Sequence, residues 1–396
     1  MPDIIGGDIV SEEDTGYEAS HIQALEGWEA VRKRPGMYVG STGERGLCQM
    51  VFEVVDRAVN EVLAGRAASV DITLTPDGGV RVADDGPGVP ADGTEGVAGP
   101  GLEALLTRMH IGAGAGGRHD VTLGFCGVGP GVVNALSRRM TAEVRREGVR
   151  WVQEYARGVA TTSLTEVRTA TGSGTTITFW PDADIFGATE VPFHRLEERF
   201  RELAFLNQGL EISLTDLRSL DESHSARLCF RGGTRAFVDF LDGHAAAHTP
   251  METITFERED PRMAGEMDIA FRWCSCPDER VQSFANSRPT IGGTHMVGFR
   301  DGTAAAVTAY AREQGLLTPA DPDIGADRIG AGLTAVVSVK LDRPEFEGAT
   351  RGVLGNSEVR DCVGQAVQNH LGRWLKQSPE RAAAVIDQIV HTTRSK

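Results

Sequence analysis

The stretch from residue 47 to residue 65, LCQMVFEVVDRAVNEVLAG, constrains the fold of this chain more than any other. Its apolar residues recur at intervals of three and four, which is the spacing of an amphipathic helix. Gly65 is a usual stop signal for such a helix. The residues Glu53, Arg57, Asn60 and Glu61 form one polar row on the opposite face. A polar row alone is most often a solvated face, so its meaning depends on the rest of the chain.

The composition limits the class of protein. The 396 residues suffice for two or three domains with packed cores. The formal net charge of -16 argues against a nucleic-acid binder, so we expect direct DNA binding to be weak or absent. The six cysteines are scattered, which is typical of reduced thiols in a cytoplasmic protein. The sequence contains neither a secretion signal nor an apolar run of membrane-spanning length, so we expect a cytoplasmic location without membrane association.

The sequence predicts helices and strands in two regions, after a loose polar arm at residues 1–16. In the first region we expect helices at 20–31, 47–64 and 101–110, a hairpin at 70–83, and strands at 141–146, 149–157 and 175–180. In the second region, which starts near residue 221, we expect strands at 267–273, 282–286 and 333–341 and helices at 298–313, 357–376 and 379–393.

Three pieces of the first region together indicate a nucleotide site. The predicted helix carries the carboxylate of Glu53, and a strand end presents Asp84 before a Gly-x-Gly turn. A glycine-rich loop at 124–129 then opens a further helix. A carboxylate at a strand end can accept a hydrogen bond from an exocyclic amine such as that of adenine. Glycines let backbone amides approach phosphates, and a helix N-terminus favours anions.

At this point a family resemblance is clear. The segments FEVVDRAVNEVLAG, GVRVADDGPGVP, GVVNALS, GSGTTITFWP, FRGGTRAFVDFL and GLTAVVSVKL resemble the N-terminal part of the DNA gyrase B protein and of its topoisomerase IV counterpart. The resemblance extends over residues 17–393 and implies an α+β fold. It implies a GHKL (Bergerat) α/β sandwich that binds ATP at residues 17–220. A ribosomal-protein-S5-like α/β transducer domain would follow at 221–396.

The resemblance also implies roles for particular residues. Glu53 corresponds to the base that activates water, and Asp84 to the residue that binds the adenine amino group, with Thr175 supporting it. Tyr17 lies in the arm that reaches over a partner subunit, which implies a homodimer. Arg146 corresponds to an arginine at the pocket mouth that touches aminocoumarin inhibitors. The pocket wall and the phosphate lid are assigned to Gly86, Gly88, Val54, Val55, Val82, Val89, Ile177, Gly124, Gly127 and Gly129.

The chain departs from the family pattern at the positions that handle metal and phosphate. Arg57 stands where the family has the asparagine that holds magnesium, and an arginine has no lone pair for a metal. Arg57 could pair with Glu53 one turn earlier, or replace the charge of the metal against a phosphate. Gln49 replaces the histidine that partners the base, and Arg351 replaces the lysine that contacts the terminal phosphate. Pro87 also replaces an arginine that pairs with the helix glutamate, so Glu61 is expected to lose its partner.

The resemblance implies ATP as the ligand, whereas the departures make a magnesium site doubtful and leave open whether the chain is an enzyme. We expect a gyrase-B-like protein that binds ATP or a related adenine ligand with weak or altered hydrolysis. Gyrase B continues into a domain that cooperates in DNA cleavage, and we expect this chain to be a stand-alone paralogue and not a complete topoisomerase. Two alternatives stay open. The chain could be an ATP-using or small-molecule-converting enzyme of a biosynthetic pathway, or a resistance protein that binds gyrase inhibitors or a gyrase regulator.

Overall fold

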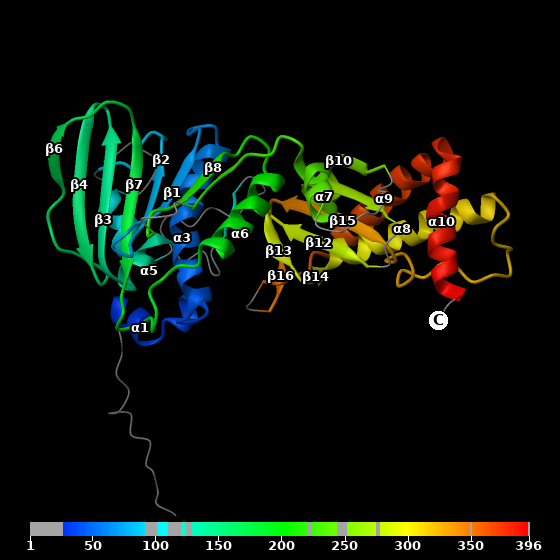
Figure 1. Cartoon of the computed structure of the whole chain (residues 1–396), viewed down its shortest axis with the longest axis horizontal. Helices are drawn as coiled ribbons and strands as arrows, with labels where there is room; N and C mark the ends of the chain where they lie inside the picture. Colours follow the sequence, from blue (N-terminus) through cyan, green and yellow to red (C-terminus); the bar gives the residue numbers. More distant parts are fainter. Residues whose placement is uncertain are drawn as a thin grey trace, which may run out of the picture.

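The structure is a computed structural model that describes residues 27–91, 101–109, 120–123, 129–219, 224–243, 252–274, 278–348 and 351–394. The molecule is elongated, with one large sheet at one end and the C-terminal helix near the other (Figure 1). Each sheet has its own buried core, the first running from Val31 to Leu228 and the second from Ile254 to Ile389. Each predicted region therefore has a core of its own, and a third cluster packs Phe205 and Leu206 of the first region against Phe237, Phe284 and Val336 of the second.

The first region is built on one mixed sheet. Its strand order is β5-β4-β3-β7-β2-β1-β8-β9, and β6 pairs with β4. The neighbours β1 and β2 are antiparallel, whereas β1 and β8 are parallel. The strands are β1 (Val70–Leu74), β2 (Val80–Asp84), β3 (Ser137–Arg146), β4 (Val149–Ala156), β5 (Val159–Ala160), β6 (Thr165–Thr169), β7 (Gly174–Pro181), β8 (Ile212–Asp216) and β9 (His224–Leu228).

The long helix α3 (Glu44–Leu63) is the predicted amphipathic helix, with one additional turn at its start. Its apolar face packs into the first core through residues such as Leu47, Met50 and Val54, which are at most 1% exposed. Gly65 lies in the left-handed region at φ 70°, where glycine is favoured, and ends the helical segment. The other helices of this region are α1 (Trp28–Lys33), α2 (Gly36–Val39), α4 (Leu102–Thr107), α5 (Pro130–Ala135) and α6 (Phe193–Leu206).

The second region has a five-stranded sheet with the order β10-β11-β15-β12-β13. Its central strand β15 (Leu333–Leu341) pairs antiparallel with β11 (Gly265–Trp273) and parallel with β12 (Arg280–Ala285). The remaining elements are β10 (Ile254–Asp260), the short helix Pro261–Met263, β13 (Arg288–Thr290), β14 (Gly292–Gly293), β16 (Phe346–Glu347), β17 (Val353–Leu354), α7 (Gly233–Gly243), α8 (Thr294–Glu313), α9 (Ser357–Gln377) and α10 (Pro379–Arg394).

The helices α8 and α9 approach each other through glycines. A Cβ atom at Gly298 would lie 2.3 Å from the carbonyl oxygen of Arg360, and one at Gly302 would lie 2.3 Å from that of Gly364. These distances are far below van der Waals contact, so the two backbones meet at a separation that excludes any side chain. The crossing fixes how α8 and α9 sit on one another.

The structure confirms the predicted helices and strands of both regions where they are described, with small changes at their ends. The helix predicted at 20–31 is described only from residue 27, and the observed α1 begins at Trp28. The elements α6, α7 and β10 were not predicted from the sequence. No helix within the described ranges is both long and apolar enough to cross a membrane.

The predicted domain boundary at residue 220 falls between β8 and β9, which pair in one sheet. A boundary inside a pair of hydrogen-bonded strands would divide the first sheet. We therefore propose that the first domain extends to Leu228, with the second domain following it.

Candidate functional site

The centre of the candidate site is the contact between α3 and the end of β2. Asp84 is the last residue of β2, and its side chain is fully buried. Its Oδ2 atom pairs with Nη2 of Arg57, whose side chain is 14% exposed. Its Oδ1 atom accepts a hydrogen bond of 3.0 Å from the backbone amide of Gly86. Both oxygens of the predicted adenine-binding carboxylate are thus engaged by the chain itself.

This contact differs from a pair with Glu53, one of the two roles that the sequence left open for Arg57. The Oε2 atom of Glu53 instead accepts a hydrogen bond of 2.9 Å from the amide of Gly129, and Glu53 is 2% exposed. Arg57 turns to the other buried carboxylate on its side of the helix, that of Asp84. Arg57 therefore pairs with Asp84, which is 27 residues away in sequence, and not with Glu53, which lies one helical turn away.

Gly129 marks where the predicted lid joins α5. Its φ of 82° requires the left-handed conformation that glycine adopts at little cost, and α5 begins at the next residue. The bond from its amide to Glu53 fixes this end of the lid to α3. Gly124, Cys126, Gly127 and Tyr17 lie outside the described residues.

The turn after β2 is held by the neighbouring strands. Gly88 has φ 79°, and a Cβ atom there would lie 2.7 Å from the carbonyl oxygen of Arg145. Thr175 lies opposite Asp84 in the β2–β7 register, and its hydroxyl accepts a hydrogen bond of 3.1 Å from the amide of Val89. Arg146 donates from Nη1 to the carbonyl oxygen of Gly88 at 3.1 Å. This turn therefore has a defined shape, which the glycines and the β3 backbone impose.

The apolar residues predicted to line the pocket are buried around this turn. The structure places Val54, Val55, Val82, Val89 and Ile177 in the first core, each at most 8% exposed. These residues are therefore part of the packed core of the first domain.

Glu61 keeps a partner despite Pro87. It accepts hydrogen bonds of 2.7 Å and 3.2 Å from Arg66, just beyond the exposed end of α3. The family partner of Glu61 is absent because position 87 is proline, and Arg66 pairs with Glu61 instead. A nearby arginine in the sequence has taken the place of the one that the family pattern supplies.

Two residues of α3 have contacts that no pattern in the sequence assigned to them. The amide side chain of Asn60 donates to the carbonyl oxygen of Val121 at 3.0 Å and accepts from the amide of the same residue at 2.8 Å. Asp56 accepts a hydrogen bond of 2.6 Å from the amide of Leu123. Together with Glu53, they tie segments on both sides of the predicted lid to α3. For Asn60, the available signal was its place in the polar row of the helix.

Two further predicted site residues, Gln49 and Arg351, make no hydrogen bond to Arg57 or Asp84 among the described residues. Gln49 lies on α3 one turn before Glu53, and its Oε1 atom is buried without a hydrogen-bond partner in the part of the chain that is described. Arg351 lies between β16 and β17 in the second region, exposed and at φ 51°. Its role at a terminal phosphate stays a prediction.

The residues present do not fit a magnesium ion of the family kind. The position of the expected metal ligand is a guanidinium group, which repels a cation and offers no lone pair. Asp84, the neighbouring carboxylate, already accepts hydrogen bonds from Arg57 and Gly86. Among the described residues, no group of three His, Cys, Asp or Glu side chains is placed to hold a metal.

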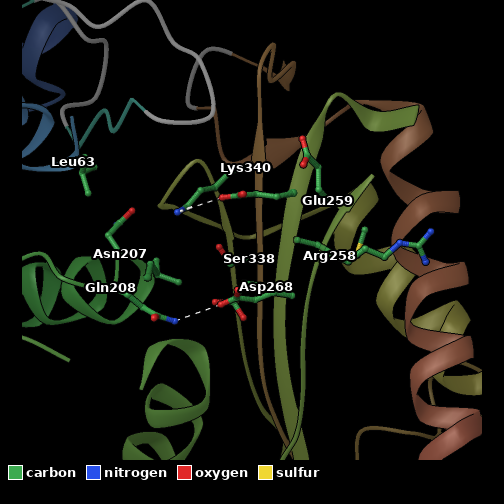
Figure 2. A pocket seen from close by; sticks show the side chains of 12 residues that line it. Leu63, Asn207, Gln208, Arg258, Glu259, Asp268, Ser338 and Lys340 are labelled. Carbon is green, nitrogen blue, oxygen red and sulfur yellow. Dashed lines mark hydrogen bonds and ion pairs between the residues drawn. The ribbon is translucent and has the colours of Figure 1, made fainter. Parts of the chain in front are cut away.

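A separate hollow of about 490 Å³ lies where the first region meets the second sheet (Figure 2). Leu63 from α3 and Asn207 and Gln208 after α6 face Asp268 of β11 and Lys340 of β15 across it. Burial raises the pKa of Asp268 to about 6. This hollow was not predicted from the sequence, because it is formed by segments far apart in the chain.

Polar contacts cross or border this hollow. An ion pair of 3.6 Å joins Lys340 to Glu266, and a hydrogen bond of 3.4 Å joins Gln208 to Glu257. The second of these contacts links the segment after α6 to β10, so it connects the two regions. The hollow is thus bordered by charged groups and is distinct from the apolar wall of the candidate nucleotide site.

Comparison with known proteins assigns both regions. A family model described as histidine kinase-, DNA gyrase B- and HSP90-like ATPase matches residues 42–185, and a model described as DNA gyrase B matches residues 233–396. The chain is 43% identical to the DNA gyrase B protein of Streptomyces coelicolor, over 96% of this chain and 58% of that protein. It is 40% identical to the novobiocin-sensitive DNA gyrase B protein of Streptomyces niveus, over 96% of this chain and 59% of that protein.

A solved structure agrees with these matches. The 43K ATPase domain of Thermus thermophilus gyrase B, in complex with an aminocoumarin, superposes with a TM-score of 0.74 at 32% identity, covering 92% of this chain and 94% of that one. The fold and the site thus define a GHKL-type ATPase domain joined to a transducer-type domain, which confirms the predicted fold class. The chain belongs to the DNA gyrase B family. It spans 58% of the length of the S. coelicolor relative.

Proposed function

We propose that this chain binds a nucleotide between α3, the end of β2 and the predicted lid, and that it does not hydrolyse the nucleotide by the magnesium-dependent route of its family. The ion pair between Arg57 and Asp84 is the observation that carries the proposal. It puts a cation where the family pattern requires a metal ligand, and it engages the carboxylate that the pattern assigns to the adenine ring.

The rest of the site supports nucleotide binding. The turn at 86–89 keeps its glycine-dependent shape against β3, and the apolar wall is packed around it. The bond from the amide of Gly129 to Glu53 holds this carboxylate against the start of α5, which supports its proposed place beside the phosphates. We propose that these groups still hold the nucleobase and the phosphates, and that dimerisation through the N-terminal arm and Tyr17 accompanies binding.

The hydrolysis claim can be tested by calorimetry and turnover assays on the whole chain. We expect a triphosphate nucleotide to bind equally well with magnesium and with a chelator. We expect turnover at least about 100-fold below that of the N-terminal region of S. coelicolor gyrase B assayed in parallel, because metal and electrostatic stabilisation contribute several kcal/mol to such reactions. The control variant is Glu53→Gln. Magnesium-dependent turnover that this variant abolishes would show an ordinary ATPase and contradict the proposal.

A further inference from the structure

The buried end of the candidate pocket has an unusual balance of donors and acceptors. Arg57 uses Nη2 for Asp84, and its buried Nε has no hydrogen-bond partner within the described chain. A guanidinium group carries five N–H donors and no acceptor. A buried donor without a partner is costly, since it has lost its water and gained nothing in return.

The acceptors at this end are already used. Asp84 receives one hydrogen bond on each carboxylate oxygen, from Arg57 and from Gly86. The hydroxyl of Thr175 accepts from Val89. The negative charge of Asp84 is balanced by the guanidinium, so the edge that would meet a nucleobase now offers mainly N–H donors.

This balance discriminates between the two kinds of purine. Adenine presents an amino group at C6, which is itself a donor and would face the donors of Arg57. Both kinds of purine have an acceptor at N7, but only guanine and hypoxanthine add a second acceptor beside it, the oxygen at C6. The inference therefore places the N7 edge of the base against Arg57, because the N1 edge of a 6-oxopurine carries an N–H donor. Arginine donating to O6 and N7 is the commonest specific contact between a protein and guanine in nucleic acids. The ligand that satisfies Arg57 is therefore one with an oxygen at this position.

We propose that Arg57 is the specificity-determining residue of this pocket and that it selects nucleotides of 6-oxopurines over those of adenine. The proposal rests on the proposed function, because it requires that the pocket binds a nucleotide at all. It replaces the adenine ligand expected from the family resemblance with a ligand of the complementary hydrogen-bonding pattern.

The test compares inosine triphosphate with ATP, two ligands that differ in the group at C6 and the hydrogen-bonding pattern it sets, by calorimetry on the whole chain with a chelator present. We expect the unmodified chain to bind inosine triphosphate at least about tenfold more tightly, because ATP leaves donors facing one another. Arg57→Asn, which introduces the residue of the family pattern, should reverse the preference by a similar factor. Arg57→Gln serves as a second variant should Arg57→Asn fail to fold.

The matched control is Arg66→Asn, which removes an arginine just beyond the same helix. Arg66 pairs with Glu61 at the surface, away from Asp84, so its loss should leave the ratio of the two affinities unchanged.

The outcomes separate the two proposals. Equal or tighter binding of ATP by the unmodified chain overturns the inference and leaves nucleotide binding in place. ATP binding by Arg57→Asn when the unmodified chain binds neither nucleotide overturns both the inference and the proposed function, because Arg57 then simply closes the pocket. Absence of any nucleotide binding by the unmodified chain and both variants overturns the proposed function itself.

Discussion

The two regions each bury an arginine against aspartate, and the two arginines differ in how fully they are satisfied. Arg272 on β11 is 9% exposed in its side chain and donates to Asp242, Asp239 and Thr253. Asp242 is in turn held by Thr334 of β15. Arg57 pairs with the carboxylate of Asp84 and has a buried Nε that nothing in the described chain accepts from.

This difference separates a structural ion pair from a functional one. A buried pair stabilises a fold only where additional hydrogen bonds satisfy the remaining donors and acceptors. The Arg272 cluster meets this condition and ties α7 and the residue before β10 to the second sheet. The Arg57 pair does not meet it, which is why we assign its open donors to a ligand.

The largest effect is expected from Arg272→Ala. Its removal leaves Asp242, whose side chain is 11% exposed, with only Thr334 and the longer pair with Arg280 among the described residues, so we expect the free energy of unfolding of the second region to fall by about 3 kcal/mol. Denaturant unfolding followed by tryptophan fluorescence measures it, because Trp273 is the next residue. The control is Arg360→Ala, which removes an exposed pair with Asp301 and should cost less than about 1 kcal/mol. Equal costs for the two variants would contradict the contrast between buried and exposed pairs.

Asp268 is a carboxylate of the second region whose hydrogen-bond partner is a hydroxyl and not a guanidinium. Burial raises its pKa from 3.8 to about 6, and Thr234 donates a hydrogen bond to it. The folded chain thus binds the proton of Asp268 more tightly than the unfolded chain does. Burying the ionised carboxylate therefore lowers the free energy of unfolding by nothing well below pH 3.8, and by the full amount above about pH 6.

The second largest effect is therefore expected from Asp268→Asn. We expect this variant to raise the free energy of unfolding by about 3 kcal/mol at pH 8 and by about half of that at pH 5. Unfolding curves at both pH values measure the difference. If the gain in the free energy of unfolding grew as the pH falls, folding would lower the pKa of Asp268 and not raise it.

The smallest effect is expected from Arg57→Asn on stability. Asp84 keeps its hydrogen bond from Gly86, and water can enter the space that the guanidinium leaves at the pocket. We expect a loss of about 1–2 kcal/mol, below that of Arg272→Ala, because the asparagine amide can still donate a hydrogen bond to Asp84 whereas Arg272→Ala leaves no donor. Thermal unfolding of the variant without nucleotide measures it. A loss as large as that of Arg272→Ala would make the Arg57 pair structural and remove the basis for assigning it to a ligand.

The sequence predicted those parts of the fold that have a local signal. The period of α3, the alternation of the β1–β2 hairpin and the apolar run of β15 were each sufficient for their element. The helix α6 was missed although its buried residues Leu196, Phe200 and Leu203 recur at intervals of three and four, so its local signal was present. The hollow beside Asp268 has no local signal, because its walls come from both regions.

At the site, the sequence indicated the residues but not all of their partners. It placed Glu53, Asp84 and the glycine turn in one pocket, and it identified Arg57 as incompatible with a metal. It could not show that Arg57 pairs with Asp84, because the nearer carboxylate of Glu53 is taken by the amide of Gly129. The partner of Arg57 depends on which carboxylates are buried and which accept from backbone amides, and helical spacing predicts neither.

The glycine crossing of α8 and α9 has a practical consequence for recombining this chain with its relatives. Gly298 and Gly302 face backbone carbonyls, and a compensating substitution can shorten a side chain but cannot remove a carbonyl oxygen. The helices α8 and α9 should therefore be exchanged between relatives as one unit. A chimera that takes residues 294–313 from one parent and 357–377 from another needs glycine at both positions, whereas a junction that keeps the pair together is free of that restriction.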